Sequence, residues 1–219
     1  DYYRIANQTV ARQLGGLHSA KLLMTSVDFA GIEELQRAGE WERAGELLAA
    51  EARALAAGGA DMVLLCTNTM HIVADQVAAA VDIPFLHIVD VTADAVHAAG
   101  CKRVGLLATG FTMEQPFYRE RMAGHGIEVI VPEPDDRALV HRVIYEELCL
   151  GIIRDESRAA YRDVITRLVA AGADGILLAC TEIELLIGQD DSPLPVFPTT
   201  RLHVEAAVAK ALEGSPTEG

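Results

Sequence analysis

A cysteine followed by a threonine and a glutamate, Cys180-Thr181-Glu182, stands at the end of an apolar run in the second half of the chain. The run predicts a buried strand, and the three residues after it predict a strand-to-helix turn. A thiolate can act as a base, and a helix N-terminus lowers a thiol pKa below its ordinary value of about 8.5. We therefore expect Cys180 to be a functional thiol. A buried cysteine that serves only as a small hydrophobe is the alternative.

The same pattern occurs 113 positions earlier, because residues 59–69 align with residues 172–182 without a gap. The alignment pairs Thr67, not Cys66, with Cys180. Side chains alternate along a strand, so this offset points Cys66 away from the site and sets Thr67 opposite Cys180. Cys66 in the site is the alternative, because strand ends can twist. Two such turns could address one small molecule from opposite faces, which is the geometry that racemisation needs.

Further polar residues follow predicted strands at the same sheet edge. Asn68 and Thr69 continue the first turn, and Thr109 comes directly after the apolar run 103–108. We expect their amide and hydroxyl groups, with nearby backbone N–H groups, to hold a carboxylate. An ordinary helix N-cap is the alternative for Thr109. His71 either polarises the site or is a helix-face histidine.

Short apolar segments alternate with helical patterns, and this alternation predicts parallel sheets covered by helices on both faces. The fold class is therefore α/β. Strands are expected at residues 20–26, 62–66, 84–88, 103–108, 128–131, 175–179 and 195–197. Helices are expected at residues 2–14, 32–37, 41–57, 70–81, 92–99, 113–123, 136–150, 156–171, 182–187 and 202–212.

The internal repeat predicts two similar parallel-sheet α/β domains related by a pseudo-two-fold axis, with the active site in the cleft between them. The first domain is expected to comprise residues 1–91 plus 200–219, and the second residues 92–199. Ligands of such sheets bind at the carboxyl ends of the strands. Because the chain opens on a helix, we also expect an N-terminal strand of the first domain to be missing.

Composition excludes several classes of protein. The 219 residues carry a formal net charge of −14, which argues against nucleic acid and anionic membrane surfaces as partners. No uncharged apolar run approaches the roughly 18 residues of a membrane span. Four cysteines without a CxxC spacing predict a reducing cytoplasm. The scattered histidines predict no metal site. No lysine stands at the ligand end of a strand, so pyridoxal phosphate has no anchor and no cofactor is expected.

Cys180-Thr181-Glu182 and Thr67-Asn68-Thr69 resemble the two marks of the aspartate/glutamate racemase superfamily, which are Cys-Thr-Glu and Cys-Asn-Thr. The resemblance covers nearly the whole chain, and residues 112–115 and 146–151 are similar to the broad-specificity amino-acid racemases close to enteric L-aspartate/L-glutamate racemases. It implies a cofactor-independent racemase that forms a homodimer. Cys180, as thiolate, would remove the α-proton, and Thr67, standing in place of the family's first cysteine, would return one.

The resemblance also extends to substrate contacts. We expect Asn68, Thr69, Thr109 and Thr181 to hold the α-carboxylate and the ammonium group of an amino acid. Glu182 would orient the catalytic groups. Gln36 stands where aspartate racemases place a basic residue for the distal carboxylate, so a strict preference for acidic substrates is not expected. Two other functions fit the same residues: a single-cysteine decarboxylase or isomerase of this fold, and a non-catalytic amino-acid-binding protein.

Overall fold

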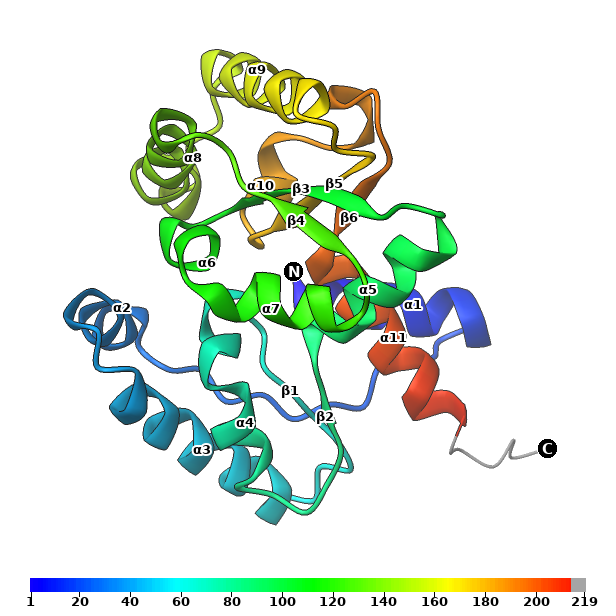
Figure 1. Cartoon of the computed structure of the whole chain (residues 1–219). Coiled ribbons are helices and arrows are strands. Elements are labelled where there is room, and N and C mark those ends of the chain that lie inside the picture. Colours follow the sequence, from blue (N-terminus) through cyan, green and yellow to red (C-terminus); the bar gives the residue numbers. More distant parts are fainter. Residues whose placement is uncertain (214–219) are drawn as a thin grey trace. The chain divides into compact units, whose positions relative to one another are not determined.

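The computed structural model describes residues 1–213 of the chain, which separate into two compact units (Figure 1). Unit 1 comprises Asp1–Cys66, Met70–His87 and the chain from His203 onward, and unit 2 comprises Thr67–Thr69 and Ile88–Leu202. The domain boundaries and the pseudo-two-fold axis expected from the repeat stay predictions.

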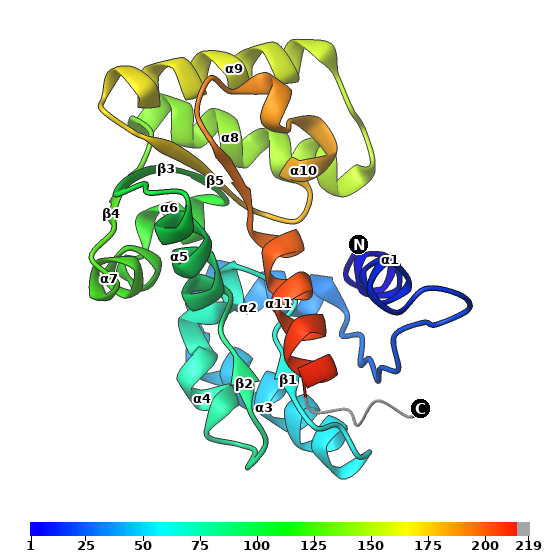
Figure 2. The same cartoon turned by 90° about the vertical axis from the view of Figure 1, so that its right-hand side faces the viewer.

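Unit 2 is built on a four-stranded sheet whose strands are all parallel, in the order β4-β3-β5-β6. Its strands are β3 (Arg103–Ala108), β4 (Glu128–Ile130), β5 (Gly175–Ala179) and β6 (Val196–Pro198). Helices α8 (Pro134–Glu146) and α9 (Asp155–Ala170) cover one face, while α5 (Ile88–Ala98) and α7 (Pro116–Gly124) cover the other (Figures 1 and 2). This two-sided cover explains why β5 consists only of buried residues.

The remaining elements of unit 2 are short. They are α6 (Gly110–Glu114), α10 (Ile183–Leu186) and the 3₁₀ turns η2 (Leu148–Leu150) and η3 (Gln189–Asp191). The large apolar cluster of this unit holds the inner residues of β3 and β5 together with two fully buried tyrosines, Tyr118 and Tyr161. The site residues of unit 2 are therefore attached to a rigid sheet.

Unit 1 has a smaller sheet, in which β1 (Val63–Leu64) pairs in parallel with β2 (Phe85–Leu86). Its helical segments are α1 (Tyr2–Leu14), α2 (Phe29–Ala38), α3 (Trp41–Ala57), η1 (Thr69–Val73), α4 (Ala74–Ala78) and α11 (Thr199–Glu213), of which η1 and α11 begin in unit 2. Two separate apolar clusters stabilise it, one under α3 and β1 and one between α1 and α11. Within residues 1–213, no helix combines the length and apolarity required to cross a membrane.

The sequence repeat is also a repeat of local structure. Both helices that precede the repeated strands are followed by a glycine with a left-handed backbone, Gly59 at φ 91° and Gly172 at φ 93°. The two strands also share a hydrogen bond at aligned positions, because Val63 N and Ile176 N each donate to a proline carbonyl at 2.9 Å. The two halves thus enter their turns with matching backbones.

The strand expected at residues 20–26 is wrong, because this segment has no regular secondary structure. A strand requires a neighbour to satisfy its backbone hydrogen bonds, and in the described chain β1 and β2 of the unit 1 sheet pair only with each other. Its apolar residues Leu22, Leu23 and Met24 are exposed accordingly.

Three expected helices are interrupted. The helix expected at 113–123 splits into α6 and α7 at Gln115, which has an extended backbone because a residue before proline avoids the helical region. The helix expected at 70–81 is a 3₁₀ turn followed by a single short helix, α4, and the helix expected at 136–150 ends at Glu146 before the turn η2.

Candidate active site

Polar residues follow the strands β3, β5 and β6 where these end side by side. Ala108 and Ala179 are partners in the β3–β5 pair, so their successors Thr109 and Cys180 leave the sheet next to each other. On the other side of β5, the strand β6 is followed directly by Thr199. The carboxyl edge of unit 2 therefore carries two hydroxyl groups with a thiol between them, at the place where parallel α/β sheets bind ligands.

Segment 67–69 is fastened at one end to the residue after β6. Asn68 is buried, and its Nδ2 donates to Thr199 Oγ1 at 3.0 Å. The Thr199 hydroxyl in turn donates to the carbonyl oxygen of Leu178 at 3.0 Å. A hydroxyl can accept and donate at once, so Thr199 joins the segment to β5 through two hydrogen bonds.

The same segment is fastened at its other end to the residues after β3. Thr69 Oγ1 lies 3.0 Å from Thr109 Oγ1 and 3.0 Å from Thr112 Oγ1, and all three side chains are buried. Thr109 also caps α6, since its Oγ1 accepts from Thr112 N at 3.3 Å. Because β5 lies between β3 and β6, the segment spans the end of the strand that is followed by Cys180.

The Cys180 thiol is buried and bonded to its own turn. Cys180 Sγ lies 3.0 Å from Glu182 Oε2, and Thr181 Oγ1 donates to the same oxygen at 2.6 Å. A carboxylate oxygen only accepts, so the sulfur is the donor and carries its proton. Glu182 thus accepts hydrogen bonds from Cys180 and Thr181, and its role in orienting the catalytic groups stays a prediction.

The expected lowering of the thiol pKa is wrong. Burial raises the pKa of Cys180 well above its ordinary value, and the negative charge of Glu182 and the hydrogen bond to it raise it further. The helix after the turn, α10, has only four residues and begins three positions after the cysteine, so its dipole acts weakly on the sulfur. Cys180 therefore rests as a thiol.

Two residues near the thiol were missed by the sequence analysis. Tyr161 is fully buried on α9, and burial, followed by the charges of Cys180 and Glu147, raises its pKa. Cys149, in the turn η2, has a pKa raised to about 11 by desolvation and by the charge of Glu182. Neither follows a strand, so no strand-end pattern could have indicated them.

Some candidate residues lie in unit 1. Gln36 is buried on α2, where its Nε2 donates to the sulfur of Met70 at 3.0 Å, and within residues 1–213 its Oε1 has no hydrogen-bond partner. Cys66 is exposed, and the chain passes from unit 1 to unit 2 directly after it. His71 is buried with its ring 4.5 Å from that of His87. The relation of these residues to Cys180 stays a prediction.

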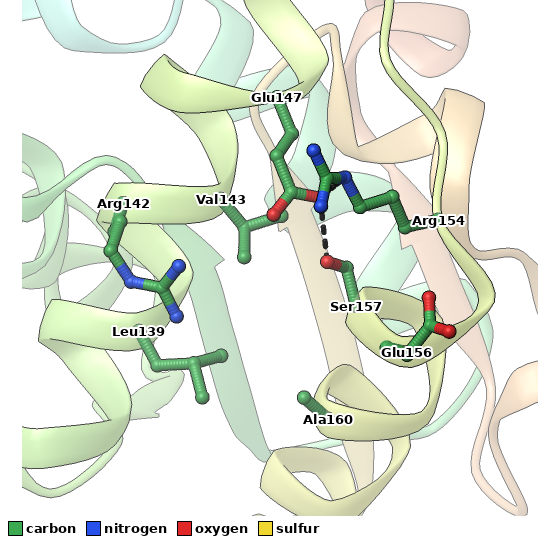
Figure 3. Close-up of a pocket in the computed structure, with 8 residues that line it drawn as sticks. All are labelled: Leu139, Arg142, Val143, Glu147, Arg154, Glu156, Ser157 and Ala160. Carbon is green, nitrogen blue, oxygen red and sulfur yellow. Dashed lines mark hydrogen bonds and ion pairs between the residues drawn. The ribbon is translucent and has the colours of Figure 1, made fainter.

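A pocket of about 260 Å³ lies between α8 and α9 and does not include the expected site residues (Figure 3). Its buried carboxylate, Glu147, accepts from Ser157 Oγ at 2.6 Å and lies 3.8 Å from Arg154 Nε. Two arginines and two glutamates are among its lining residues: Leu139, Arg142, Val143, Glu147, Arg154, Glu156, Ser157 and Ala160. The opposite charges offset each other, so the pocket shows no preference for an anion or a cation.

The profile of the family described as Asp/Glu/Hydantoin racemase matches residues 1–207 of the sequence. The chain belongs to this family. Its α/β fold with parallel sheets is shared by solved structures of the family. A presumed Asp/Glu racemase from Yersinia pestis is 53% identical over 96% of this chain and 92% of its own, with a TM-score of 0.90.

More distant relatives give the same picture. An aspartate racemase homologue from Pyrococcus horikoshii is 28% identical over 97% of this chain and 92% of its own, with a TM-score of 0.82. The broad-specificity amino-acid racemase RacX of Bacillus subtilis is 24% identical over 70% of this chain, which spans 66% of that relative's length. The family likeness implies isomerase activity.

Proposed function

We propose that this protein is an amino-acid racemase that works without pyridoxal phosphate, with Cys180 and Thr67 acting on opposite faces of the substrate Cα. The observation that supports it best is the fastening of segment 67–69 across the end of the strand that is followed by Cys180. This arrangement brings the first turn of the repeat to the same edge as the thiol. The family match supports the reaction class.

Cys180 has to lose its proton before it can take one from a substrate. The hydrogen bond to Glu182 offers a path for this proton, because Sγ of Cys180 and the accepting Oε2 are 3.0 Å apart. The raised pKa of Cys180 makes the thiolate rare but strongly basic. A strong base suits the α-proton of an amino acid, which is very weakly acidic. Thr67 would then return a proton to the other face, directly or through a water molecule.

The hydroxyl and amide groups of the edge would hold the substrate. Thr69 and Thr109 bond to each other in the structure, and an α-carboxylate could replace that contact by accepting from both. Asn68 and Thr181 would contact the ammonium group and the developing negative charge. Dipoles fixed in a buried site stabilise such charge more strongly than water does. Gln36 would face the distal group and favour uncharged substrates alongside acidic ones.

Other features stay proposals. We expect a homodimer in the cytoplasm, specificity for several amino acids, and a closer relation to the L-aspartate/L-glutamate racemases than to other branches. We also expect activity to survive removal of pyridoxal phosphate and metals, and to be lost on thiol alkylation. Substrate should slow the alkylation of Cys180.

The test is incubation in heavy water with single amino acids and, separately, with a malonate-type substrate, followed by proton NMR and chiral chromatography. Exchange of the α-proton with inversion supports racemisation. Loss of carbon dioxide from a malonate-type substrate without exchange would instead indicate a decarboxylase. Saturable ligand-induced shifts without any turnover would indicate a binding protein, and either result would overturn the proposal.

A further inference from the structure

A histidine outside the expected site bonds to the turn that carries Thr109. The backbone N–H of Gly110 donates to Nδ1 of His141 at 3.0 Å, and Gly110 directly follows Thr109 at the start of α6. The ring is close to the backbone, since a Cβ at position 110 would lie 3.3 Å from Nδ1. His141 belongs to α8, so it ties this helix to the end of β3.

The bond fixes the protonation state of the ring. Nδ1 accepts from Gly110, so it carries no proton, and the neutral ring must carry its hydrogen on Nε2. Burial lowers the pKa of His141, and the charge of Glu114 on α6 opposes this shift. Protonation of Nδ1 would turn the acceptor into a donor that faces another donor. The bond therefore exists only while the ring is neutral.

The groups around the ring come from α6 and α8. Phe111 lies at a ring-centroid distance of 5.9 Å and Tyr145 at 4.7 Å, so aromatic rings pack against it from both helices. Glu114 is the acidic group on α6, and Arg137 of α8 lies 3.9 Å from its carboxylate. Arg137 therefore weakens the pull of Glu114 on a proton at His141.

We infer that His141 is a positioning residue, which as a neutral acceptor holds the Thr109–Gly110 turn and releases it when it is protonated. The inference rests on the proposed function, because it matters for turnover only if Thr109 contacts the substrate. The connection runs from His141 through Gly110 to Thr109, whose hydroxyl bonds to Thr69 of the segment across Cys180. No step requires His141 to touch substrate.

The experiment compares three variants by their profiles of kcat/KM against pH. His141→Asn keeps an acceptor at the position of Nδ1 but does not titrate, and it should retain activity within about three-fold at pH 8. His141→Leu removes the acceptor and should lower kcat/KM about five- to ten-fold at every pH, because the Gly110 N–H loses its partner. His97→Asn removes an exposed histidine whose Nε2 bonds the His125 carbonyl, and it should behave like the parent.

In the parent, kcat/KM should fall about five- to ten-fold further at acidic pH, below the ordinary histidine pKa. This fall adds to the pH dependence that the Cys180 thiol causes. Both His141 variants should lack this step. A merely structural histidine would change the free energy of unfolding, and it would not add a step to the pH profile of kcat/KM that both variants lack. A step that persists in His141→Asn would overturn the inference.

A second measurement does not depend on turnover. Nitrogen-15 NMR should show an unprotonated Nδ1 on His141 at neutral pH, and the Gly110 amide signal should shift with the same midpoint as the ring. If the protein racemises nothing but these two signals titrate together, the proposed function fails and the bond stands. If the protein racemises amino acids but the Gly110 amide signal does not shift as the His141 ring titrates, the inference about His141 is wrong and the proposed function stands.

Discussion

The turns after β1 and β5 begin with the same backbone and end with different chemistry. Their preceding helices are followed by glycines with left-handed φ values of 91° and 93°, and a backbone N–H of each strand donates to a proline carbonyl. Beyond the strands, Thr67 is aligned with Cys180 and Thr69 with Glu182. One half thus presents a hydroxyl where the other presents a thiol, and a hydroxyl again where the other presents a carboxylate.

The two turns are also held in different ways. The second turn follows a five-residue strand in the middle of a four-stranded sheet, and its Glu182 accepts from its own neighbours. The first follows a two-residue strand, and its Asn68 and Thr69 bond to threonines of unit 2. The second turn is therefore stable by itself, whereas the first depends on side-chain hydrogen bonds. In this repeat the backbone leading into the two turns is similar, whereas the side chains that follow differ.

The largest expected effect separates the two cysteines. Cys180→Ser should lower kcat/KM about a thousand-fold or more, because a serine hydroxyl is far less acidic than a thiol and cannot supply the base. Cys66→Ala, the matched control from the first turn, should keep most of the activity. Chiral chromatography of the products measures both. Equal losses in the two variants would show that Cys66 faces the site and that the one-residue offset is wrong.

Glu182→Gln tests the carboxylate that has no counterpart in the first turn. Burial and the Glu182 charge both raise the pKa of Cys180, so removing the charge should move the pH midpoint of iodoacetamide alkylation of this thiol to lower pH. Turnover should nevertheless fall about ten- to a hundred-fold, since the thiol proton loses its acceptor.

Glu184→Gln is the control for this variant, because Glu184 lies two residues further on and its charge does not act on the Cys180 pKa. It should leave the alkylation midpoint unchanged. A midpoint that stays in place in Glu182→Gln as well would mean that burial alone holds the proton on the sulfur.

Thr67→Cys makes the two turns alike at the decisive position. Racemisation has an equilibrium constant of one, so kcat/KM must be equal in both directions. Any asymmetry appears in kcat and KM taken separately, or in the ratio of α-proton exchange to inversion. With Thr67, the carbanion formed by Cys180 should often regain a proton from the same side. The L-enantiomer should then exchange its α-proton in heavy water faster than it inverts, while the D-enantiomer shows little such excess.

Thr67→Cys should shrink the excess of exchange over inversion several-fold, because a thiol is a better acid than a hydroxyl. Proton NMR follows exchange, and circular dichroism follows inversion in the same sample. Thr67→Ser retains the hydroxyl and is the matched control. Equal exchange and inversion for both enantiomers, unchanged by Thr67→Cys, would remove Thr67 from the mechanism.

Sequence periodicity predicted the long elements well. The helices α1 and α3 and the strands β3 and β5 have the boundaries expected from their apolar pattern and from the glycines that follow. The prediction of a strand at residues 20–26 was wrong because a strand forms only beside a neighbouring strand. An apolar run in the sequence does not reveal whether such a neighbour is present. A proline explains the break between α6 and α7, and the rule was visible in the sequence.

The candidate site was predicted in part, for a physical reason. Residues at the ends of parallel strands meet at one edge, so Cys180, Thr109 and segment 67–69 could be grouped from the strand pattern alone. The raised pKa of the Cys180 thiol could not be predicted from the sequence, because it depends on burial and on the direction of the Glu182 side chain. His141 and Tyr161 lie on helices, where no pattern marks which residue reaches the edge.

The smallest expected effect concerns the bonds that hold the first turn. Thr199→Val removes the hydroxyl that accepts from Asn68 and donates to Leu178, so it should lower the free energy of unfolding by about 1–2 kcal/mol. Thr166→Val removes an exposed hydroxyl that donates to the Arg162 carbonyl within α9, and it should change stability by less than about 0.5 kcal/mol. Urea denaturation followed by circular dichroism measures both.

Thr199→Val should also disturb the first turn, which contains segment 67–69, and leave the second turn, which contains Cys180, unchanged. Asn68 loses an anchor, so kcat/KM should fall several-fold through poorer placement of segment 67–69. The second turn keeps its bonds between Glu182 and its two neighbours, so the pH midpoint for alkylation of Cys180 should stay that of the parent. If that midpoint moved with Thr199→Val, the two turns would not be held independently. The difference in how the two turns are hydrogen-bonded would then not explain why only the second turn carries the proposed catalytic thiol.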